Sequence, residues 1–151
     1  SIFTGEYLRT EGTNGVLGFG RPWDLRPTKL RGYYQYSAAD IGYASSEYEY
    51  LKGRPDTCHI YVALTDWTAP YEIRTKPSDR NASYVIAYGE LVFSGKMDSY
   101  QAFEIKLDYK DTSRVPSYLQ ITCSASKYGD YFTGGNGSVL YVDQFSFDYD
   151  Y

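Results

Sequence analysis

Apolar and polar side chains alternate along several short stretches of the chain, a pattern typical of strands with one buried face. In residues 28–37, Leu30, Tyr34 and Tyr36 alternate with Lys29 and other outward positions. Residues 100–109 follow the same pattern, with Phe103, Ile105, Leu107 and Tyr109 on one face. Further stretches of this kind are residues 57–66, 83–93, 117–126 and 137–149. The chain is therefore predicted to consist mainly of strands.

Helical periodicity is almost absent. The best candidate is a short helical turn within residues 37–53, which we expect to cross one end of the molecule. Between the strands lie segments rich in Gly, Pro, Asp and Ser, which favour turns and loops; they are residues 20–27, 53–57, 66–70, 75–83, 94–99 and 110–117. Many strands separated by turns predict one all-β domain over residues 1–151, an antiparallel β-sandwich of jelly-roll type.

The chain is unusually rich in aromatic residues: 19 Tyr, 7 Phe and 2 Trp occur among its 151 residues. Aromatic side chains favour strands, and tyrosine joins an apolar ring to a polar tip. We expect most of these tyrosines to line the sheets. The set is large enough to leave exposed rings for a recognition surface.

Charge and hydropathy exclude two classes of partner. The net charge is −4, so the clustered Lys and Arg of a nucleic-acid surface are not expected. No apolar run approaches the roughly 20 residues that span a bilayer, so this domain is not expected to insert into a membrane. The chain begins at Ser1 and not at Met, and we interpret it as part of a longer or processed protein.

The two cysteines give little functional information. Cys58 shares a strand face with Ile60 and Val62, and Cys123 shares one with Ile121, so both thiols are predicted to point inward. We expect two unpaired core thiols; a disulfide is possible only if the two strands are neighbours. No zinc-ligand spacing is present.

Signals for catalysis are weak. His59 is the only histidine, and a structural or surface role is expected for it. The glycine-rich residues 132–138 lack the lysine of a phosphate-binding loop and lead into a strand. A glycosidase needs two carboxyl groups at a defined separation, which the sequence alone cannot identify among 19 acidic residues.

Two loops carry a tryptophan beside polar residues that could bind a sugar. Trp23 lies between two prolines together with Arg21 and Arg26, and Trp67 follows Asp66 after a strand. The apolar face of a pyranose suits an aromatic plane, while Arg or Asp can bind its hydroxyls. The alternative is that the indoles pack at the ends of the sandwich and the arginines pair with nearby acids.

Residues 126–138 form the third candidate loop, with four glycines, two tyrosines and one aspartate. We expect a compact loop at the edge of the sandwich, from which Tyr128, Asp130 and Tyr131 reach a ligand.

Asp143 interrupts the strand that follows. Val139, Tyr141, Phe145 and Phe147 are predicted to face inward, and Asp143 has the same parity. A buried carboxylate needs a partner, so either a β-bulge turns it outward, or it has a cation or hydrogen-bond donors as partners. Calcium is the natural candidate, with Glu6 as a second carboxylate.

Four segments resemble a known family, the putative carbohydrate metabolism domain: residues 3–7, 19–37, 84–93 and 126–145. The resemblance runs from Phe3 to Tyr149. It implies a jelly roll similar to carbohydrate-binding modules, in secreted proteins or outer-membrane lipoproteins of gut bacteria, often beside an immunoglobulin-like domain. Such modules bind structural calcium at a pair of acidic residues near the last strand; here the second position is Gln144, which departs from that pattern.

Three functions follow as hypotheses. The first is a non-catalytic carbohydrate-binding module of a glycan-utilisation protein, whose partner is a poly- or oligosaccharide. The second is a glycoside hydrolase or related carbohydrate-active enzyme. The third is a structural or protein-interaction domain of a surface assembly or adhesin.

Overall fold

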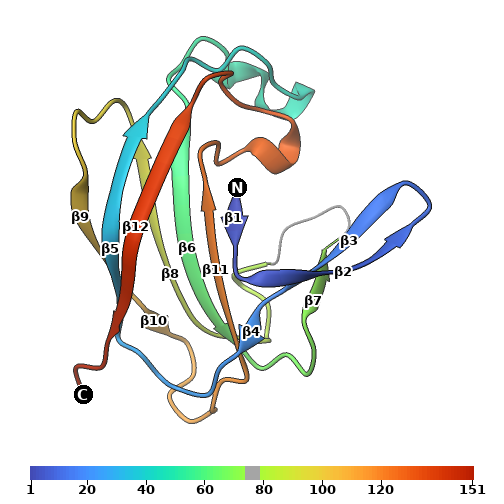
Figure 1. The fold of residues 1–151 in the computed structure, drawn as a ribbon, viewed down its shortest axis with the longest axis vertical. Helices are drawn as coiled ribbons and strands as arrows, with labels where there is room; N and C mark the ends of the chain where they lie inside the picture. Colours follow the sequence, from blue (N-terminus) through green and yellow to red (C-terminus); the bar gives the residue numbers. More distant parts are fainter. Residues whose placement is uncertain (74–78) are drawn as a thin grey trace.

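The computed structural model describes residues 1–73 and 79–151 (Figure 1). The loop predicted at residues 75–83 lies partly outside them. Within the described residues the strands are β1 (Ile2–Phe3), β2 (Gly5–Glu11), β3 (Asn14–Phe19), β4 (Arg21–Pro22), β5 (Lys29–Ser37), β6 (Thr57–Thr65), β7 (Tyr71–Ile73), β8 (Val85–Ser94), β9 (Gln101–Lys106), β10 (Asp108–Tyr109), β11 (Tyr118–Ser124) and β12 (Val139–Asp148). Two short 3-10 helices, η1 (Ser46–Leu51) and η2 (Gly129–Tyr131), complete the fold.

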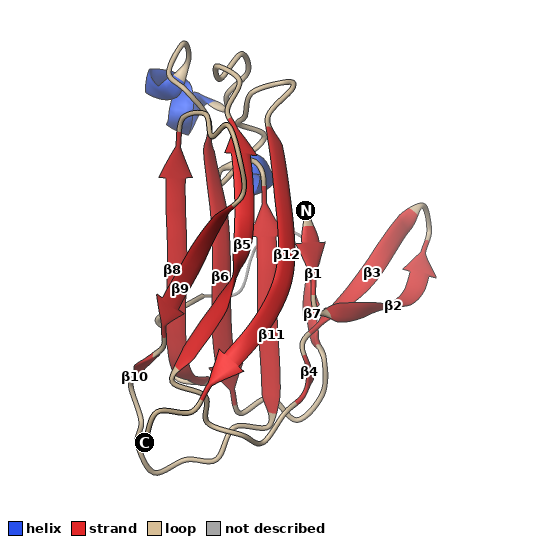
Figure 2. Cartoon of the chain, turned by 60° about the vertical axis from the view of Figure 1, so that its left-hand side comes forward, coloured by secondary structure: helices blue, strands red, loops and turns tan. Residues whose placement is uncertain are grey.

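Two antiparallel sheets pack face to face. The larger has the order β1-β11-β6-β8-β10, with β4 also pairing with β11, and the smaller has the order β12-β5-β9. Both run along the long axis of the molecule (Figure 2). A third sheet, β2-β3-β7, stands beside the sandwich, and its β2–β3 hairpin projects away from it (Figures 1 and 2). The predicted all-β sandwich of jelly-roll type is confirmed.

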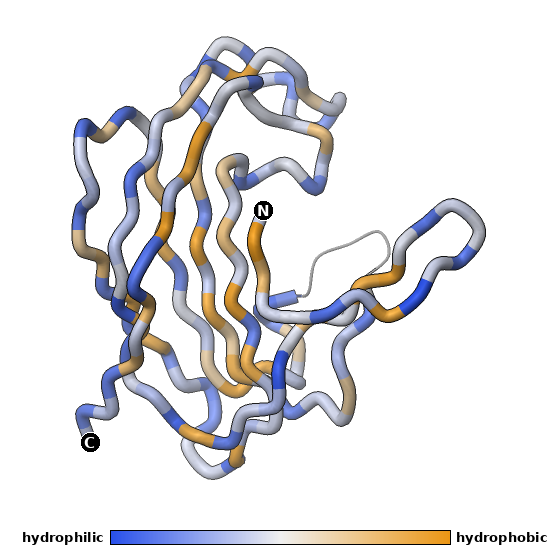
Figure 3. Tube along the Cα trace, viewed as in Figure 1, coloured by the Kyte–Doolittle hydropathy of each residue, from blue (hydrophilic) through white to orange (hydrophobic). Residues whose placement is uncertain are grey.

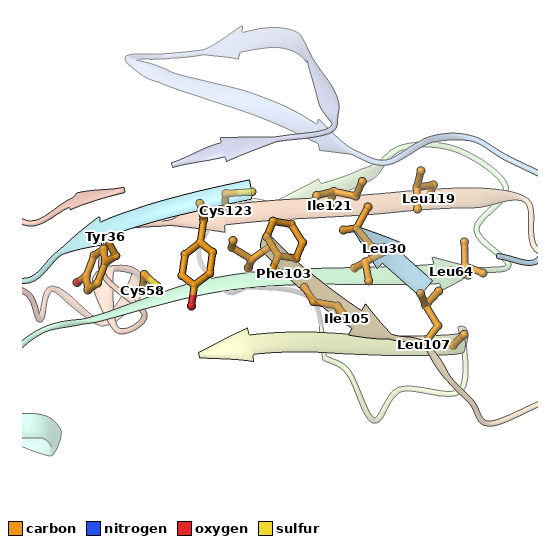
Figure 4. Close-up of a cluster of buried hydrophobic side chains, with 14 of the residues drawn as sticks. Leu30, Tyr36, Cys58, Leu64, Phe103, Ile105, Leu107, Leu119, Ile121 and Cys123 are labelled. Carbon is orange, nitrogen blue, oxygen red and sulfur yellow. The ribbon is translucent and has the colours of Figure 1, made fainter. Parts of the chain in front are cut away.

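The core lies between the two main sheets and contains the predicted inward positions of β5, β6, β9 and β11 (Figure 4). Leu30, Tyr34 and Tyr36 on β5 are at most 8% exposed. Phe103 and Ile105 on β9, the neighbouring strand of the same sheet, and Leu107 just after it lie beside them and are equally buried. Apolar residues recur along β6, β11 and β12 (Figure 3). Strand parity therefore predicted the core faces of β5 and β9 correctly, because alternation is a local consequence of the pleated backbone.

The cysteines are unpaired and buried, as predicted. Cys58 is 0% and Cys123 3% exposed, and neither forms a disulfide. Burial raises the pKa of each thiol to about 11. Both side chains therefore act as small core residues with little thiolate at neutral pH.

The predicted parity of β12 is wrong over its first half. Leu140 and Val142 pack against the core, whereas Tyr141 is 55% exposed and Asp143 is exposed as well. Asp143 thus points to solvent, and its Oδ1 atom accepts a hydrogen bond of 2.8 Å from the backbone N–H of Gln144.

A β-bulge restores the expected parity at the end of β12. Asp143 pairs with Tyr33 and Ser146 with Arg31, so two residues of β12 lie opposite one residue of β5. Gln144 adopts a left-handed conformation with φ 55°. After the bulge Phe147 packs against the core as predicted. One extra residue exchanges the two faces of a strand, and a sequence pattern alone does not place it.

The predicted helical turn is confirmed as η1, which lies at one end of the sandwich near η2 (Figure 1). Among the described residues no helix has the length and apolar character needed to cross a membrane.

Candidate functional site

A cleft of about 440 Å³ opens on the outer face of the larger sheet, the face turned away from the core. Strands β6 and β8 and the segments around η1 and η2 contribute its lining. The lining residues are Tyr48, His59, Tyr61, Asp79, Arg80, Tyr88, Lys127, Tyr128, Asp130 and Tyr131. Five of the ten are tyrosines, so the cleft is mainly aromatic.

Alternation along β6 and β8 creates the sheet side of the cleft. On β6, His59 and Tyr61 alternate with buried Ile60 and Val62, so their rings point away from the core. The ring centroids of His59 and Tyr61 are 5.2 Å apart. The ring of Tyr61 stacks on that of Tyr88 from β8 at 5.8 Å. These three rings form a continuous aromatic surface.

A charged network fixes the polar edge of this surface. Oε2 of Glu90 accepts hydrogen bonds from His59 Nε2 at 2.7 Å and from the Tyr88 hydroxyl at 3.3 Å, and Oε1 accepts one from Arg80 Nη1 at 2.5 Å. The Arg80 guanidinium also lies over the Tyr88 ring, 5.3 Å from its centroid. The network orients His59, Arg80 and Tyr88 toward the cleft.

The same contacts determine the charge states of the network. Burial disfavours the charged form of Glu90, but the hydrogen bonds from His59 and Arg80 outweigh it, so the pKa of Glu90 lies below its ordinary value. Burial lowers the pKa of His59 despite the opposing effect of Glu90. At neutral pH, Glu90 is therefore ionised and His59 is neutral, with its Nε2 proton donated to the carboxylate.

Three tyrosines from the end loops form the opposite side. The Tyr48 ring, from η1, lies 4.9 Å from that of Tyr128 and 5.2 Å from that of Tyr131. The Lys127 ammonium lies over the Tyr128 ring, 5.6 Å from its centroid.

A buried carboxylate holds the loop that carries Tyr128 and Tyr131. Asp56, just before β6, is 1% exposed. Its Oδ2 accepts hydrogen bonds from Ser126 Oγ at 2.6 Å, the backbone N–H of Gly135 at 2.8 Å and Ser138 Oγ at 2.9 Å. Its Oδ1 accepts one from the N–H of Thr57 at 2.8 Å. Four donors thus satisfy the charge and fasten both ends of residues 126–138 to the sheet.

The glycines of this loop allow close backbone contact with the segment before η1. A Cβ on Gly135 would lie 2.7 Å from the carbonyl oxygen of Ala39, closer than real Cβ atoms approach. Nearby, buried Thr133 accepts a hydrogen bond from the N–H of Ser45 through its Oγ1 atom at 3.1 Å. The loop and η1 are therefore positioned together, which fixes the relative placement of their tyrosines.

The structure brings three of the predicted ligand residues together in the cleft: Tyr128, Asp130 and Tyr131. The others lie elsewhere. Trp67 is only 7% exposed, and its ring stacks on Tyr71 with centroids 4.9 Å apart. Asp66 forms an ion pair of 2.6 Å with Arg114. Burial leaves the Trp67 ring little face for a sugar, so we assign this loop a packing role.

The loop around Trp23 also packs at an end of the sandwich, which was the alternative to sugar binding. Trp23 is partly buried against the core, with its ring 5.2 Å from that of Phe147. Arg26 lies 4.6 Å from the centroid of the Tyr109 ring and donates hydrogen bonds to the backbone carbonyls of Asp111 and Arg114. Arg21 extends into solvent, with Nη1 3.9 Å from Glu6 Oε2. This loop lies at the end of the sandwich opposite η1 (Figure 1).

The two residues expected to hold calcium lie on different sheets. Glu6 lies on β2 and Asp143 on β12, strands of different sheets. Residues 1–73 and 79–151 contain no group of three His, Cys, Asp or Glu side chains that could hold a metal ion. We therefore derive no role for calcium from these residues.

Sequence reasoning missed His59, Tyr61, Tyr88 and Arg80 as cleft residues. The signal for the first three was their outward parity on two strands, which places aromatic rings on a solvent-facing sheet surface. Asp56 was also missed, because its segment was interpreted only as a turn.

Residues 1–147 match the model of the family described as the putative carbohydrate metabolism domain. The chain belongs to this family. No curated protein matches it.

Two solved structures share the fold, and each is described as a putative glycoside hydrolase. One, from Bacteroides thetaiotaomicron VPI-5482, superposes with a TM-score of 0.70 at 21% identity over 89% of this chain. The other, from Bacteroides vulgatus ATCC 8482, superposes with a TM-score of 0.69 at 23% identity over 87%. The matches span 41% and 55% of those longer chains. At this identity the likeness establishes the fold.

Proposed function

We propose that this domain is a non-catalytic carbohydrate-binding module that holds a poly- or oligosaccharide in the aromatic cleft. The observation that carries the proposal is the lining itself: five tyrosines and a histidine surround a cleft of about 440 Å³. Ring faces suit the C–H faces of sugars, and tyrosine hydroxyls can bind sugar hydroxyls. Membership of a carbohydrate-related family supports the same class of ligand.

Polar groups in the cleft can bind sugar hydroxyls. Asp79 and Asp130 supply carboxylate acceptors, and Lys127 supplies an ammonium donor. The Asp56 hydrogen bonds and the Glu90 network hold the aromatic walls in place before a ligand arrives, which reduces the entropy cost of binding.

The state of Glu90 does not suit the general acid of a glycosidase. A glycosidase needs a general acid, a carboxyl group whose pKa is raised so that it carries a proton at working pH. The pKa of Glu90 is lowered instead of raised, and its carboxylate oxygens accept hydrogen bonds from His59, Arg80 and Tyr88.

A glycoside hydrolase is the second candidate. Two carboxylates, Asp79 and Asp130, line the same cleft, and both structural neighbours carry that description. Release of reducing sugar by the wild-type protein, and its loss in Asp79→Asn and Asp130→Asn, would establish this function instead of simple binding.

We also propose a cellular context for the module. It belongs to a secreted or cell-surface glycan-utilisation protein, beside an immunoglobulin-like domain. The family resemblance supports this context. Labelling of the protein on intact cells by a reagent that cannot cross membranes would test the surface location.

The direct test is a glycan array probed with the wild-type domain and with Tyr61→Ala. We expect specific binding by the wild type and a loss of at least about tenfold in the variant, because Tyr61 contacts rings on both sides. Tyr141→Ala, which removes an exposed tyrosine from the other sheet, is the matched control and should bind normally. Absence of binding to all plant, host and microbial glycans on the array would instead favour a structural or protein-interaction domain.

A further inference from the structure

The aromatic surface continues beyond the cleft. Tyr48 contacts Tyr128 and Tyr131 inside the cleft, and on its other side its ring lies 6.4 Å from that of Tyr50. Tyr50 is not part of the cleft lining, and it is 63% exposed. The series of rings therefore extends from inside the cleft over its rim.

The helix that carries Tyr48 and Tyr50 is a surface element anchored at both ends. None of the residues of η1 is buried. At its start, the N–H of Ser45 donates to Thr133 Oγ1 at 3.1 Å. After its end, the N–H of Gly53 donates to the carbonyl of Ile41 at 2.9 Å. These bonds hold the backbone that carries Tyr50 in a defined position beside the cleft.

The size of the cleft limits how much of a saccharide it can hold. A volume of about 440 Å³ lies in the lower half of the range of about 300–1,000 Å³ typical of pockets for small ligands. A saccharide of many units does not fit into that volume. Its remaining units would have to lie on the surface that adjoins the cleft.

We infer that the binding site extends from the cleft over Tyr50 and that the ligand is a chain of linked sugar units. This inference rests on the proposed function. Units inside the cleft contact the sheet tyrosines and the ring of Tyr48. The units that follow stack on the exposed face of Tyr50, and the carboxylate of Glu47 in the same helix is an acceptor for their hydroxyls.

The test is the dependence of affinity on ligand length. Wild-type protein and Tyr50→Ala are titrated by calorimetry with β-1,4-linked gluco-, xylo- and manno-oligosaccharides, from the disaccharide to the hexasaccharide. We expect wild-type affinity to rise with length. Tyr50→Ala should weaken hexasaccharide binding about three- to tenfold and leave disaccharide binding unchanged, because one ring contact is lost only for the longer ligand.

Two further variants complete the design. Tyr50→Phe keeps the ring and should retain most of the affinity for the hexasaccharide. Tyr141→Ala removes a tyrosine that is 55% exposed on the opposite sheet, next to Tyr100 at 6.4 Å, and should change nothing. Circular dichroism confirms that each variant is folded.

The outcomes separate the two proposals. Equal affinity at all lengths, or an unchanged hexasaccharide affinity in Tyr50→Ala, overturns the extended site and leaves the cleft proposal intact. Binding that survives Tyr61→Ala but is lost in Tyr141→Ala moves the site to the other sheet and overturns both. Absence of binding to all three series and to the array overturns both as well.

Discussion

The two ends of the sandwich are both rich in aromatic residues, but they use them differently. At the end near β7, Trp67 is 7% exposed and packs against Tyr71, Tyr84 and Tyr118. At the end near η1, Tyr131 is 39% and Tyr50 63% exposed, although their rings belong to a cluster of similar size. Ring clusters of like composition thus form a core at one end and a surface at the other.

Whether another layer covers the rings determines the difference. The small sheet β2-β3-β7 adjoins Trp67, and Gly20 lets the backbone come close: a Cβ there would lie 3.0 Å from the indole. Gly20 also has φ 98°, a conformation that favours glycine. Around Tyr48, in contrast, the end loops form one side of an open cleft whose other side is the outer face of β6 and β8. An aromatic loop in a sequence therefore indicates recognition only if nothing packs on it.

The largest expected effect is on stability, at the covered end. Trp67→Ala removes a buried indole and should reduce the free energy of unfolding by about 4 kcal/mol. Urea denaturation followed by circular dichroism measures this change. Glycan affinity of the folded variant should remain that of the wild type, whereas a selective loss of affinity would show that the covered end takes part in recognition.

The next effect links stability to the cleft. Asp56→Ala leaves the donors on Ser126, Gly135 and Ser138 without their acceptor, and should reduce the free energy of unfolding by about 3 kcal/mol. Asp56→Asn keeps one oxygen acceptor and should cost less. Because the same loop carries Tyr128 and Tyr131, both variants should also weaken glycan binding; unchanged affinity would contradict the positioning role of Asp56.

These positions also show how far the sequence could be interpreted. The core faces of β5, β6, β9 and β11 followed from alternation, which depends only on neighbouring residues. The cleft did not, because Tyr48, Tyr61, Tyr88 and Tyr128 come from four separate segments that only the fold brings together. Asp56 illustrates the same limit: a buried carboxylate is indistinguishable from a turn residue until its donors, 70 to 82 positions away, are known.

A smaller effect is expected from pH. The pKa values of His59 and Glu90 both lie below their ordinary values in the folded state, so the unfolded chain binds more protons as the pH falls. Stability should therefore decrease below about pH 6.5, where unfolded histidine gains its proton, and again below about pH 4.3, where unfolded glutamate does. Melting temperatures measured from about pH 8 to about pH 2.5 record both steps. His59→Gln should remove the first step. A wild-type melting temperature that rises as the pH falls toward 5 would contradict the lowered pKa of His59.

The smallest expected effect is that of chelation. Because Glu6 and Asp143 lie on different sheets and Asp143 accepts a hydrogen bond from Gln144, EDTA should leave the melting temperature unchanged. A clear decrease, reversed by added calcium, would require a calcium site elsewhere.

The most direct test of the central claim compares Tyr61→Ala with Trp67→Ala in one calorimetric titration series against the same β-1,4-linked hexasaccharides. Both variants remove a large aromatic ring, one from the cleft and one from the covered end. We predict that folded Tyr61→Ala loses at least about tenfold in affinity and that folded Trp67→Ala binds like the wild type. Full affinity in Tyr61→Ala together with lost affinity in folded Trp67→Ala would contradict it and place recognition at the opposite end of the sandwich.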